Sequence, residues 1–252
     1  MTISYRLTDL AYPKLLASDD VSFSAKALYD LICRRRPDSL AQLAEISGLA
    51  RRTVRKECEA LKQHEWLKFN AAKSWPTIII PTAPSTVQVE LSVELVKRKR
   101  FWARVGESIM KAMLDNIVQS SECLDNCRPQ RMSNPETGRA LELDRFYYPN
   151  VAFEFQGTQH YELTPLHKDK QHFERAKLLD LAKIGLGAKS SIQIVEITAA
   201  DLTIDGIIAK IPEVLVIQRI DMEGEYIRFL DEMGRDYIVN SESRRAQDRA
   251  ST

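Results

Sequence analysis

The 252-residue chain lacks the compositional features of several protein classes. No apolar run approaches the roughly 20 residues of a membrane span, and the first residues, MTISYRLTDL, lack the apolar core of a signal peptide. Net charge is also almost absent, because 36 Lys and Arg balance 35 Asp and Glu to a formal +1. We therefore expect a cytoplasmic, nucleoid-associated protein without a membrane partner, whose binding to nucleic acid depends on a local basic patch.

Cysteine is scarce, with four residues in the chain. Only Cys123 and Cys127, in CLDNC, are close in sequence, and no second Cys or His pair at ligand spacing accompanies them. A zinc site takes about four N or S ligands, so we prefer to interpret these residues as reduced thiols. Apolar residues, in contrast, make up 44% of the chain and are sufficient to bury a core. We expect a globular protein with one large domain or two small ones.

Prolines and small polar residues in PTAPS, Pro81 to Ser85, interrupt the helical and strand periodicity and indicate a linker. Three helical patterns precede it, and the third, near Ala50 to Gln63, follows a glycine turn, SGL. Polar residues can cap the first two helices: Ser22 or Ser24, and Asp38 or Ser39. WLKF and WPTIII follow as a candidate hairpin. The segment SLAQLAEISGLARRTVRKECEALKQHEWLKF resembles bacterial winged helix-turn-helix domains, and the resemblance covers most of residues 20 to 81. We therefore expect such a domain, with its linker, over residues 1–85.

Basic residues crowd the first two turns of the third helical pattern, mostly off the apolar stripe of Val54, Cys58 and Leu61. In a winged helix this helix contacts base edges and phosphates. Basic residues on a helix also occur as a solvated face, and winged helices also serve as protein-docking modules. We expect DNA binding through the following residues: Arg51, Arg52, Thr53, Arg55 and Lys56.

A second domain is expected over residues 86–240, beginning with a long helical segment from residue 87 to about 125. Its most informative stretch is LELDRFYYPNVAFEFQGTQHY, Leu141 to Tyr161, in which two runs alternate with the period of a strand. If Tyr148, Pro149 and Asn150 form a hairpin loop, Asp144 lies opposite Glu154 with Cβ atoms roughly 5 Å apart.

Two carboxylates at that distance repel each other unless a cation lies between them, and oxygen ligands favour Mg²⁺ or Mn²⁺. The alternative is the solvated face of an antiparallel sheet, where acidic residues cost little. GTQH then brings His160 close to the carboxylates, where it can act as a general acid or base. A helical pattern with Asp180 and Lys183 at i and i+3 follows, and then an apolar strand from Ile192 to Ile197. The expected order is strand, strand, helix, strand.

Two segments of the chain are similar to the PD-(D/E)XK, or restriction-endonuclease-like, nucleases. They are NPETGRALELDRFYYPNVAFEFQGTQHY and LLDLAKIGLGAKSSIQIVEI. The similarity covers about residues 100 to 200 and is greatest to the branch of very-short-patch-repair and EDxHD homing endonucleases. It implies an α/β domain with a central mixed sheet flanked by helices. It also implies the following site: Asp144 and Glu154 as metal ligands, Glu107 as an acid from the first helix, Gln156 where many members have lysine, His160 after the glycine turn, and Asp180 and Lys183 on the next helix.

Gln156 departs from the common motif of that family. A lysine at this position polarises the attacking water and stabilises charge on the phosphate, whereas a glutamine can only form hydrogen bonds. Lys183 or His160 would then have to supply the missing function. If neither reaches the site, the protein binds metal and DNA without cutting.

We therefore expect an α+β protein of two domains that acts as a Mg²⁺- or Mn²⁺-dependent endodeoxyribonuclease, positioned on DNA by a winged helix. The alternatives are a catalytically degenerate DNA-binding or regulatory protein and a nuclease subunit of a transposition or phage replication assembly. A homodimer or an assembly partner is compatible with each. The polar tail, residues 241–252, has no apolar face and is expected to be disordered.

Overall fold

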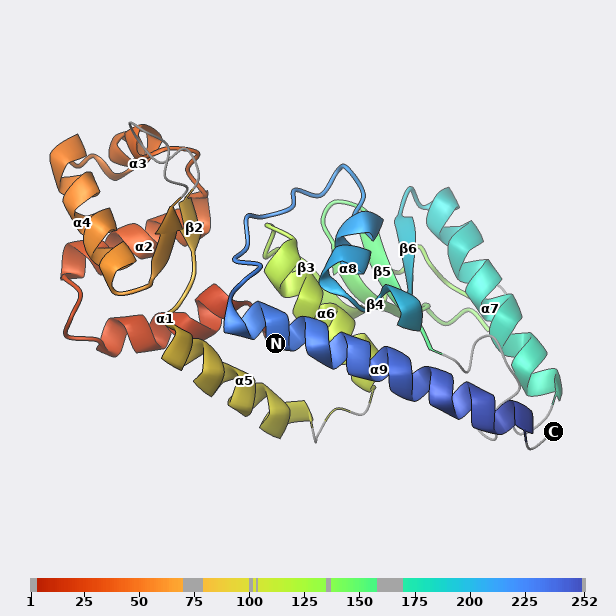
Figure 1. Cartoon of the computed structure of the whole chain (residues 1–252). Coiled ribbons are helices and arrows are strands. Elements are labelled where there is room, and N and C mark those ends of the chain that lie inside the picture. Colours follow the sequence, from red (N-terminus) through yellow and green to blue (C-terminus); the bar gives the residue numbers. More distant parts are fainter. Residues whose placement is uncertain are drawn as a thin grey trace. The chain divides into compact units, whose positions relative to one another are not determined.

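The computed structural model describes residues 4–69, 79–99, 102, 104–134, 137–157 and 170–250, and the protein is α+β (Figure 1). Two compact units are present. The N-terminal unit comprises the described residues of Ser4–Trp102 and Gln218–Phe229. The C-terminal unit comprises those of Ala103–Ile217 and Leu230–Thr252.

The N-terminal unit contains helices and a two-stranded antiparallel sheet. In chain order its elements are α1 (Leu7–Ala17), α2 (Phe23–Arg35), α3 (Leu40–Ser47), α4 (Arg51–Gln63), β1 (Leu67–Phe69), β2 (Ile79–Pro81) and α5 (Ser85–Lys99). The antiparallel pairing of β1 and β2 confirms the predicted hairpin, with Lys68 opposite Ile80. The NAAKS segment between these strands lies outside the described residues.

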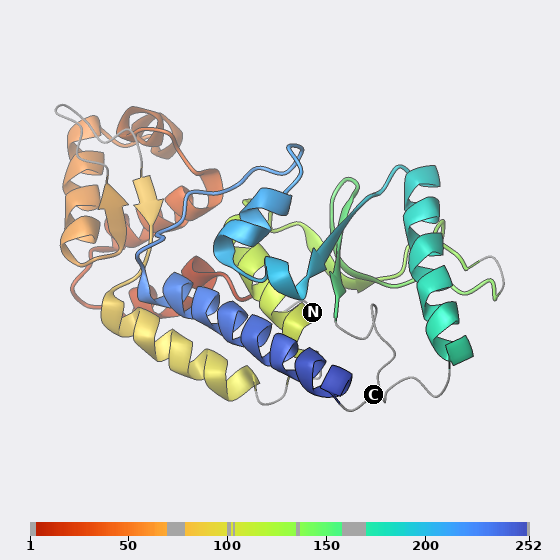
Figure 2. The ribbon, with the colours of Figure 1, turned by 45° about the vertical axis from the view of Figure 1, so that its right-hand side comes forward.

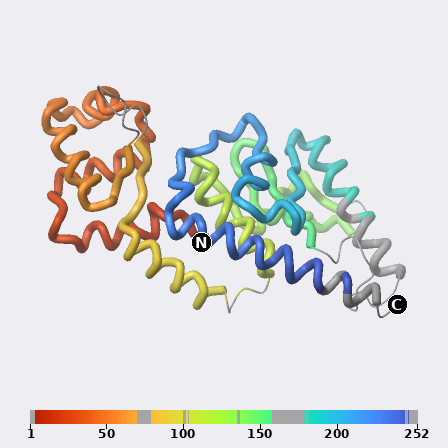
Figure 3. Tube along the Cα trace, viewed as in Figure 1, coloured from red at the N-terminus to blue at the C-terminus, as the bar shows by residue number. Residues whose placement is uncertain are grey.

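Local hydrogen bonds determine where the first helices begin and end. The side chains of Ser22 and Ser39 each accept a backbone N–H three residues later, at the starts of α2 and α3. α3 ends at Gly48, whose φ of 68° lies in the left-handed region that glycine adopts without steric cost. The chain can therefore turn sharply into α4 (Figure 3). The predicted apolar stripe of α4 is buried: Val54, Cys58 and Leu61.

A segment far along the chain, Gln218–Phe229, belongs to the N-terminal unit. Within it the buried Asp221 accepts a hydrogen bond from Nζ of Lys68 at 2.8 Å. The unit also includes α5, which packs against α1. Both α5 and this segment were predicted to lie in the second domain, because contacts between distant parts of a chain leave no local sequence signal.

The C-terminal unit combines helices with a four-stranded sheet. In chain order its elements are α6 (Val105–Ile117), β3 (Cys123–Cys127), β4 (Leu143–Tyr147), β5 (Val151–Gln156), α7 (Lys170–Lys189), β6 (Gln193–Thr198), the 3₁₀ turn η2 (Ala199–Asp201), α8 (Ile204–Lys210) and, from Leu230, α9 (Glu225–Ala250). The predicted order of strand, strand, helix, strand is confirmed. The prediction of one long helical segment from residue 87 to about 125 is wrong. CLDNC at its end forms the strand β3, which is hydrogen-bonded to β4.

The four strands form a mixed sheet in the order β3-β4-β5-β6 (Figure 2). Neighbours from β3 to β5 are antiparallel, and β6 runs parallel to β5. Met132, Phe146 and Ala152 form part of an apolar cluster against which Leu186 of α7 packs. α6 packs against β5. Helices therefore flank the sheet, as predicted.

α9 continues to Ala250 and so includes residues 241–250 of the tail that was predicted to be disordered. Arg, Glu, Gln and Ala in this tail are good helix formers, so the helix that the preceding apolar residues begin can extend into a polar segment. Ser241 is buried, although the tail as a whole has no apolar face. Among the helices of the described ranges, none combines the length and the hydropathy needed to cross a lipid bilayer.

Candidate active site

The predicted register of the β4–β5 hairpin is confirmed. Arg145 pairs with Phe153, and Tyr147 pairs with Val151, so the loop has the three predicted residues, 148–150. The same register, continued by one residue away from the loop, sets Asp144 of β4 opposite Glu154 of β5. These residues are the two predicted carboxylates.

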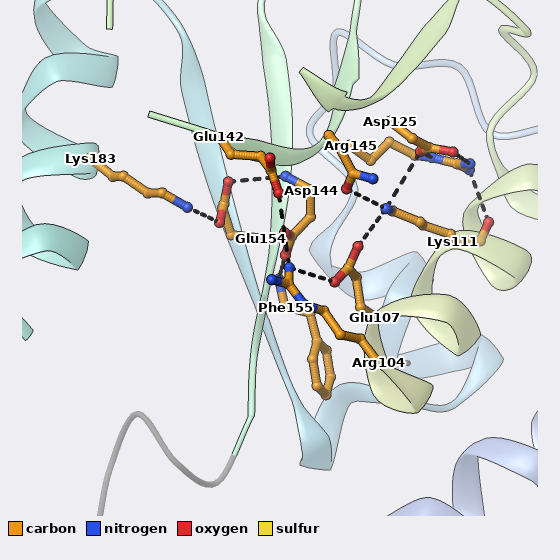
Figure 4. A network of polar contacts seen from close by, with 11 residues as sticks. Arg104, Glu107, Lys111, Asp125, Glu142, Asp144, Arg145, Glu154, Phe155 and Lys183 are labelled. Atoms are coloured by element: carbon orange, nitrogen blue, oxygen red, sulfur yellow. Dashed lines mark hydrogen bonds and ion pairs between the residues drawn. The ribbon is translucent and has the colours of Figure 1, made fainter. Parts of the chain in front are cut away.

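The carboxylates of Asp144 and Glu154 lie side by side and are buried, with 8% and 5% of each residue exposed. The backbone N–H of Asp144 donates to Oε1 of Glu154 at 3.2 Å. In return, the backbone N–H of Phe155 donates to Oδ2 of Asp144 at 2.8 Å. Each carboxylate is thus held by the backbone of the opposite strand, which fixes the pair between β4 and β5 (Figure 4).

The environment of the pair disfavours two negative charges. Burial raises the pKa of Glu154 to about 7, and the charge of Asp144 adds to this effect. Burial also raises the pKa of Asp144, with a further contribution from the charge of Glu107. Groups perturbed in this way by both burial and like charge are characteristic of functional sites.

Lys183 extends from α7 to the pair. Its Nζ donates to Oε2 of Glu154 at 2.6 Å (Figure 4). α7 is anchored to the sheet through Leu186, less than one turn further along the helix. This anchoring keeps Lys183 close to Glu154.

Glu107 lies in the first turn of α6 and is buried. Nζ of Lys111 donates to Oε1 of Glu107 at 2.5 Å, and Nη1 of Arg104 donates to Oε2 at 3.2 Å. The hydrogen bond that Arg104 donates to Glu107 raises the pKa of Arg104. Neither cation was predicted as a site residue, although their spacing of i−3 and i+4 around Glu107 is that of neighbours on one helix face.

A buried ion network extends from Lys111 to Arg145 and its two acidic partners, Asp115 and Asp125. Nη1 of Arg145, whose side chain is fully buried, donates to the backbone carbonyl of Lys111 at 2.9 Å and to Asp115 at 2.6 Å. Its Nε donates to Asp125 of β3 at 2.8 Å. Burial opposes the charge of Arg145, but Asp115 and Asp125 outweigh it and hold the pKa of Arg145 well above its usual range. The network joins α6, β3 and β4, and so helps to fix the position of Glu107.

Gln156 is buried two residues after Glu154, on the same face of β5. Its Nε2 lies 3.5 Å from Oε1 of Glu196 on β6. Its Oε1 is buried and has no hydrogen-bond partner among the described residues.

The structure thus brings together Glu107, Asp144, Glu154 and Lys183, and it adds Arg104 and Lys111. His160 lies outside the described residues. Asp180 lies on α7, but its side chain is outside the described part of the chain. The parts that these two residues would play remain predictions.

The residues predicted to bind DNA lie on α4 of the N-terminal unit. Four of them are exposed, and Thr53 is half-buried. The exposed residues lie on the side of α4 that faces away from its buried stripe. They are Arg51, Arg52, Arg55 and Lys56.

Metal ligation requires more donors than the acidic pair supplies. Over the described ranges, no group of three or more His, Cys, Asp or Glu side chains is placed to hold a metal ion. Asp144 and Glu154 provide two carboxylates, and Mg²⁺ sites in proteins commonly use one or two carboxylates with waters and other oxygens. The donor chemistry of the pair therefore suits a hard divalent cation.

Part of the chain is similar in sequence to a viral protein. No model of a known protein family matches the chain, and no solved structure matches it. A protein of Frog virus 3 (isolate Goorha), named Uncharacterized protein 094L, is 33% identical to the chain over 90 residues. The match covers 34% of this chain and 58% of that protein. The chain thus spans little more than half the length of that relative, and the relative's name specifies no activity.

Proposed function

We propose that this chain is a Mg²⁺- or Mn²⁺-dependent endodeoxyribonuclease whose active site is centred on Asp144 and Glu154. The observation that carries the proposal is the buried pair of carboxylates, each with a raised pKa, contacted by Lys183 at 2.6 Å. Burying two like charges costs folding free energy, so the arrangement is better explained by a ligand than by stability. The similarity of residues 100 to 200 to PD-(D/E)XK nucleases supports the same activity.

A divalent ion would be held by Asp144 and Glu154. When bound, it would lower the pKa of a water molecule and neutralise charge on the scissile phosphate. Glu107 contributes negative charge near Asp144, as its effect on the pKa of Asp144 indicates. Lys111 and Arg104 keep the Glu107 carboxylate in a fixed position by hydrogen bonds to its two oxygens.

Lys183 supplies the positive charge that many related nucleases carry two residues after the second acid. Its ammonium group, beside Glu154, can stabilise the negative charge that develops on the phosphate during hydrolysis. Arg104 is a second candidate for phosphate contact, because 68% of its side chain is exposed and a guanidinium has five N–H donors. Gln156 cannot supply this charge.

The N-terminal unit would bind the DNA. Support comes from the glycine turn between α3 and α4, the antiparallel hairpin after α4, and exposed basic residues on α4 that include Arg51 and Arg52. This order of elements resembles that of a winged helix-turn-helix and so supports the proposal. Because the whole chain is nearly neutral, we expect this local patch to carry the affinity, and we expect binding to weaken as salt rises.

Replacing Asp144 tests the catalytic proposal. Asp144→Asn keeps the shape of the side chain but removes its charge, so we expect cleavage to fall by about 100-fold or more while DNA affinity is unchanged. Lys183→Ala should also slow cleavage. Nicking of supercoiled plasmid with Mg²⁺ and with Mn²⁺ measures the rate, and a gel-shift assay measures DNA affinity. Glu213→Gln, an exposed acid of the same unit, is the control and should cut at the wild-type rate. Full-rate cleavage by Asp144→Asn would show that the active site lies elsewhere.

The absence of a lysine at Gln156 favours a second candidate, a degenerate module that binds DNA and metal without cutting. A wild-type chain that binds both but nicks no plasmid with either ion would support it. Cleavage that appears only on adding an extract containing partner proteins would instead indicate a subunit of a larger nuclease assembly.

A further inference from the structure

Gln156 carries an oxygen that is buried without a partner. The residue is 7% exposed, and no described group donates a hydrogen bond to its Oε1. Leaving such an acceptor unsatisfied destabilises the fold, because the group loses its hydrogen bonds to water on burial. A buried acceptor of this kind, on the strand face that carries Glu154, needs a partner such as a water molecule or a cation.

The neighbouring carboxylate of Glu196 sets the orientation of the amide. Nε2 of Gln156 points to Oε1 of Glu196, at 3.5 Å. Turning the amide over would bring its oxygen, an acceptor, against a carboxylate, which is also an acceptor. The unpaired atom is therefore the oxygen, and this oxygen has lone pairs that can bind a cation. A lysine at the same place would offer the opposite, a cation.

The acidic pair by itself has few oxygens left for a ligand. Oε1 of Glu154 accepts the N–H of Asp144, and Oε2 of Glu154 accepts from Lys183. Oδ2 of Asp144 accepts the N–H of Phe155, and among the described residues no hydrogen bond reaches its Oδ1. Among the oxygens of the acidic pair and Gln156, those that accept no hydrogen bond from a described residue are thus Oδ1 of Asp144 and Oε1 of Gln156.

We infer that Oε1 of Gln156 is a third protein ligand of the divalent ion held by Asp144 and Glu154. The inference rests on the proposed function. A neutral oxygen adds a ligand without adding a third like charge to the pair, and hard divalent ions accept amide oxygens. The cation missing from this strand position is supplied from α7 by Lys183, so the strand position itself can carry a ligand oxygen instead of a positive charge.

Metal binding by the full chain without DNA tests this assignment. Gln156→Met keeps the length of the side chain but removes the oxygen, and Glu196 remains at the surface, so the fold should be retained. We expect Mn²⁺ affinity, measured by electron paramagnetic resonance, to fall by about tenfold or more. Gln156→Glu should bind Mn²⁺ at least as tightly as the wild type. Gln193→Met, an exposed glutamine on β6, is the control and should not change the affinity.

A reciprocal exchange tests these roles of Gln156 and Lys183. Gln156→Lys alone places a second cation at the pair and should abolish Mn²⁺ binding. Combining it with Lys183→Gln moves the cation to the strand and the amide to the helix. The double variant should recover Mn²⁺ binding and part of the plasmid nicking.

Two outcomes separate this inference from the proposed function. If the wild type binds Mn²⁺ and nicks plasmid while Gln156→Met binds Mn²⁺ as tightly, the ligand assignment is wrong and the nuclease proposal stands. A wild type that neither binds Mn²⁺ nor nicks plasmid overturns both.

Discussion

At the scale of single residues, the Asp144–Glu154 pair opposes the stability of the metal-free fold. The pKa of Glu154 rises from 4.5 to about 7 on folding, chiefly through burial and then through the charge of Asp144. A carboxyl whose pKa is raised on folding is bound to its proton more tightly in the folded state. Its contribution to stability is therefore most favourable below about pH 4.5, and it is lost as the pH rises through about 7.

Glu154→Gln has no proton to lose and should remove this pH dependence. In the absence of metal, we expect the variant to be more stable than the wild type at about pH 8, by on the order of 1 kcal/mol, with a smaller difference at about pH 5. Urea denaturation in EDTA at both pH values gives the free energies of unfolding. Glu213→Gln, which replaces an exposed acid, should match the wild type at both. A difference that grows towards low pH would contradict the raised pKa.

At the scale of elements, the approach of α6 to β5 depends on Gly106. A Cβ at this position would lie 2.3 Å from two ring atoms of Phe155 and 2.9 Å from the ring of Tyr237 on α9. Only a residue without a side chain allows this approach. The same contact places the next residue, Glu107, near Asp144, so packing and site geometry are linked at one glycine.

Gly106→Ala should destabilise the protein by about 1–3 kcal/mol, because the clash with aromatic rings outweighs the better helix propensity of alanine. It should also weaken Mn²⁺ binding by displacing Glu107. The matched control is Gly185→Ala on α7, where an added Cβ meets nothing within 4 Å. We expect this control to be neutral or to stabilise by up to about 1 kcal/mol. Urea denaturation measures both, and equal effects of the two substitutions would contradict the packing argument.

At the scale of the whole molecule, charge is nearly balanced, so proposed contacts with DNA depend on where basic residues gather. Arg51 and Arg52 are exposed at the start of α4, and Lys97 and Arg98 are exposed near the end of α5 in the same unit. Removing either pair changes the net charge equally. Only the first pair lies where a recognition helix would contact DNA.

Arg51→Ala with Arg52→Ala should lower DNA affinity and reduce the slope of log affinity against log salt by about 2, one unit for each phosphate that is no longer neutralised. Lys97→Ala with Arg98→Ala should leave both nearly unchanged. Fluorescence anisotropy of labelled duplex DNA, from about 50 to 200 mM salt, measures affinity and slope. Equal losses for the two pairs would indicate nonspecific attraction, and no loss for the first would favour a protein-docking role for α4.

Local sequence determined the parts of this protein that depend on neighbours along the chain. Serine caps, the glycine turn before α4, and the three-residue loop between β4 and β5 are set by contacts over a few residues, and each lies where the pattern predicts. Period-two alternation with that loop length was sufficient to set Asp144 opposite Glu154. It could not show how deeply the pair is buried.

Tertiary structure alone decided which elements cover each face. Periodicity indicates the face of a strand on which a residue lies, but it does not identify the helix that packs there. For this reason the sequence did not predict the burial of Arg145 between Asp115 and Asp125, or the cations that hold Glu107. It also did not predict that CLDNC is an edge strand, since the hydrogen bonds of that strand come from β4, about 20 residues later in the chain.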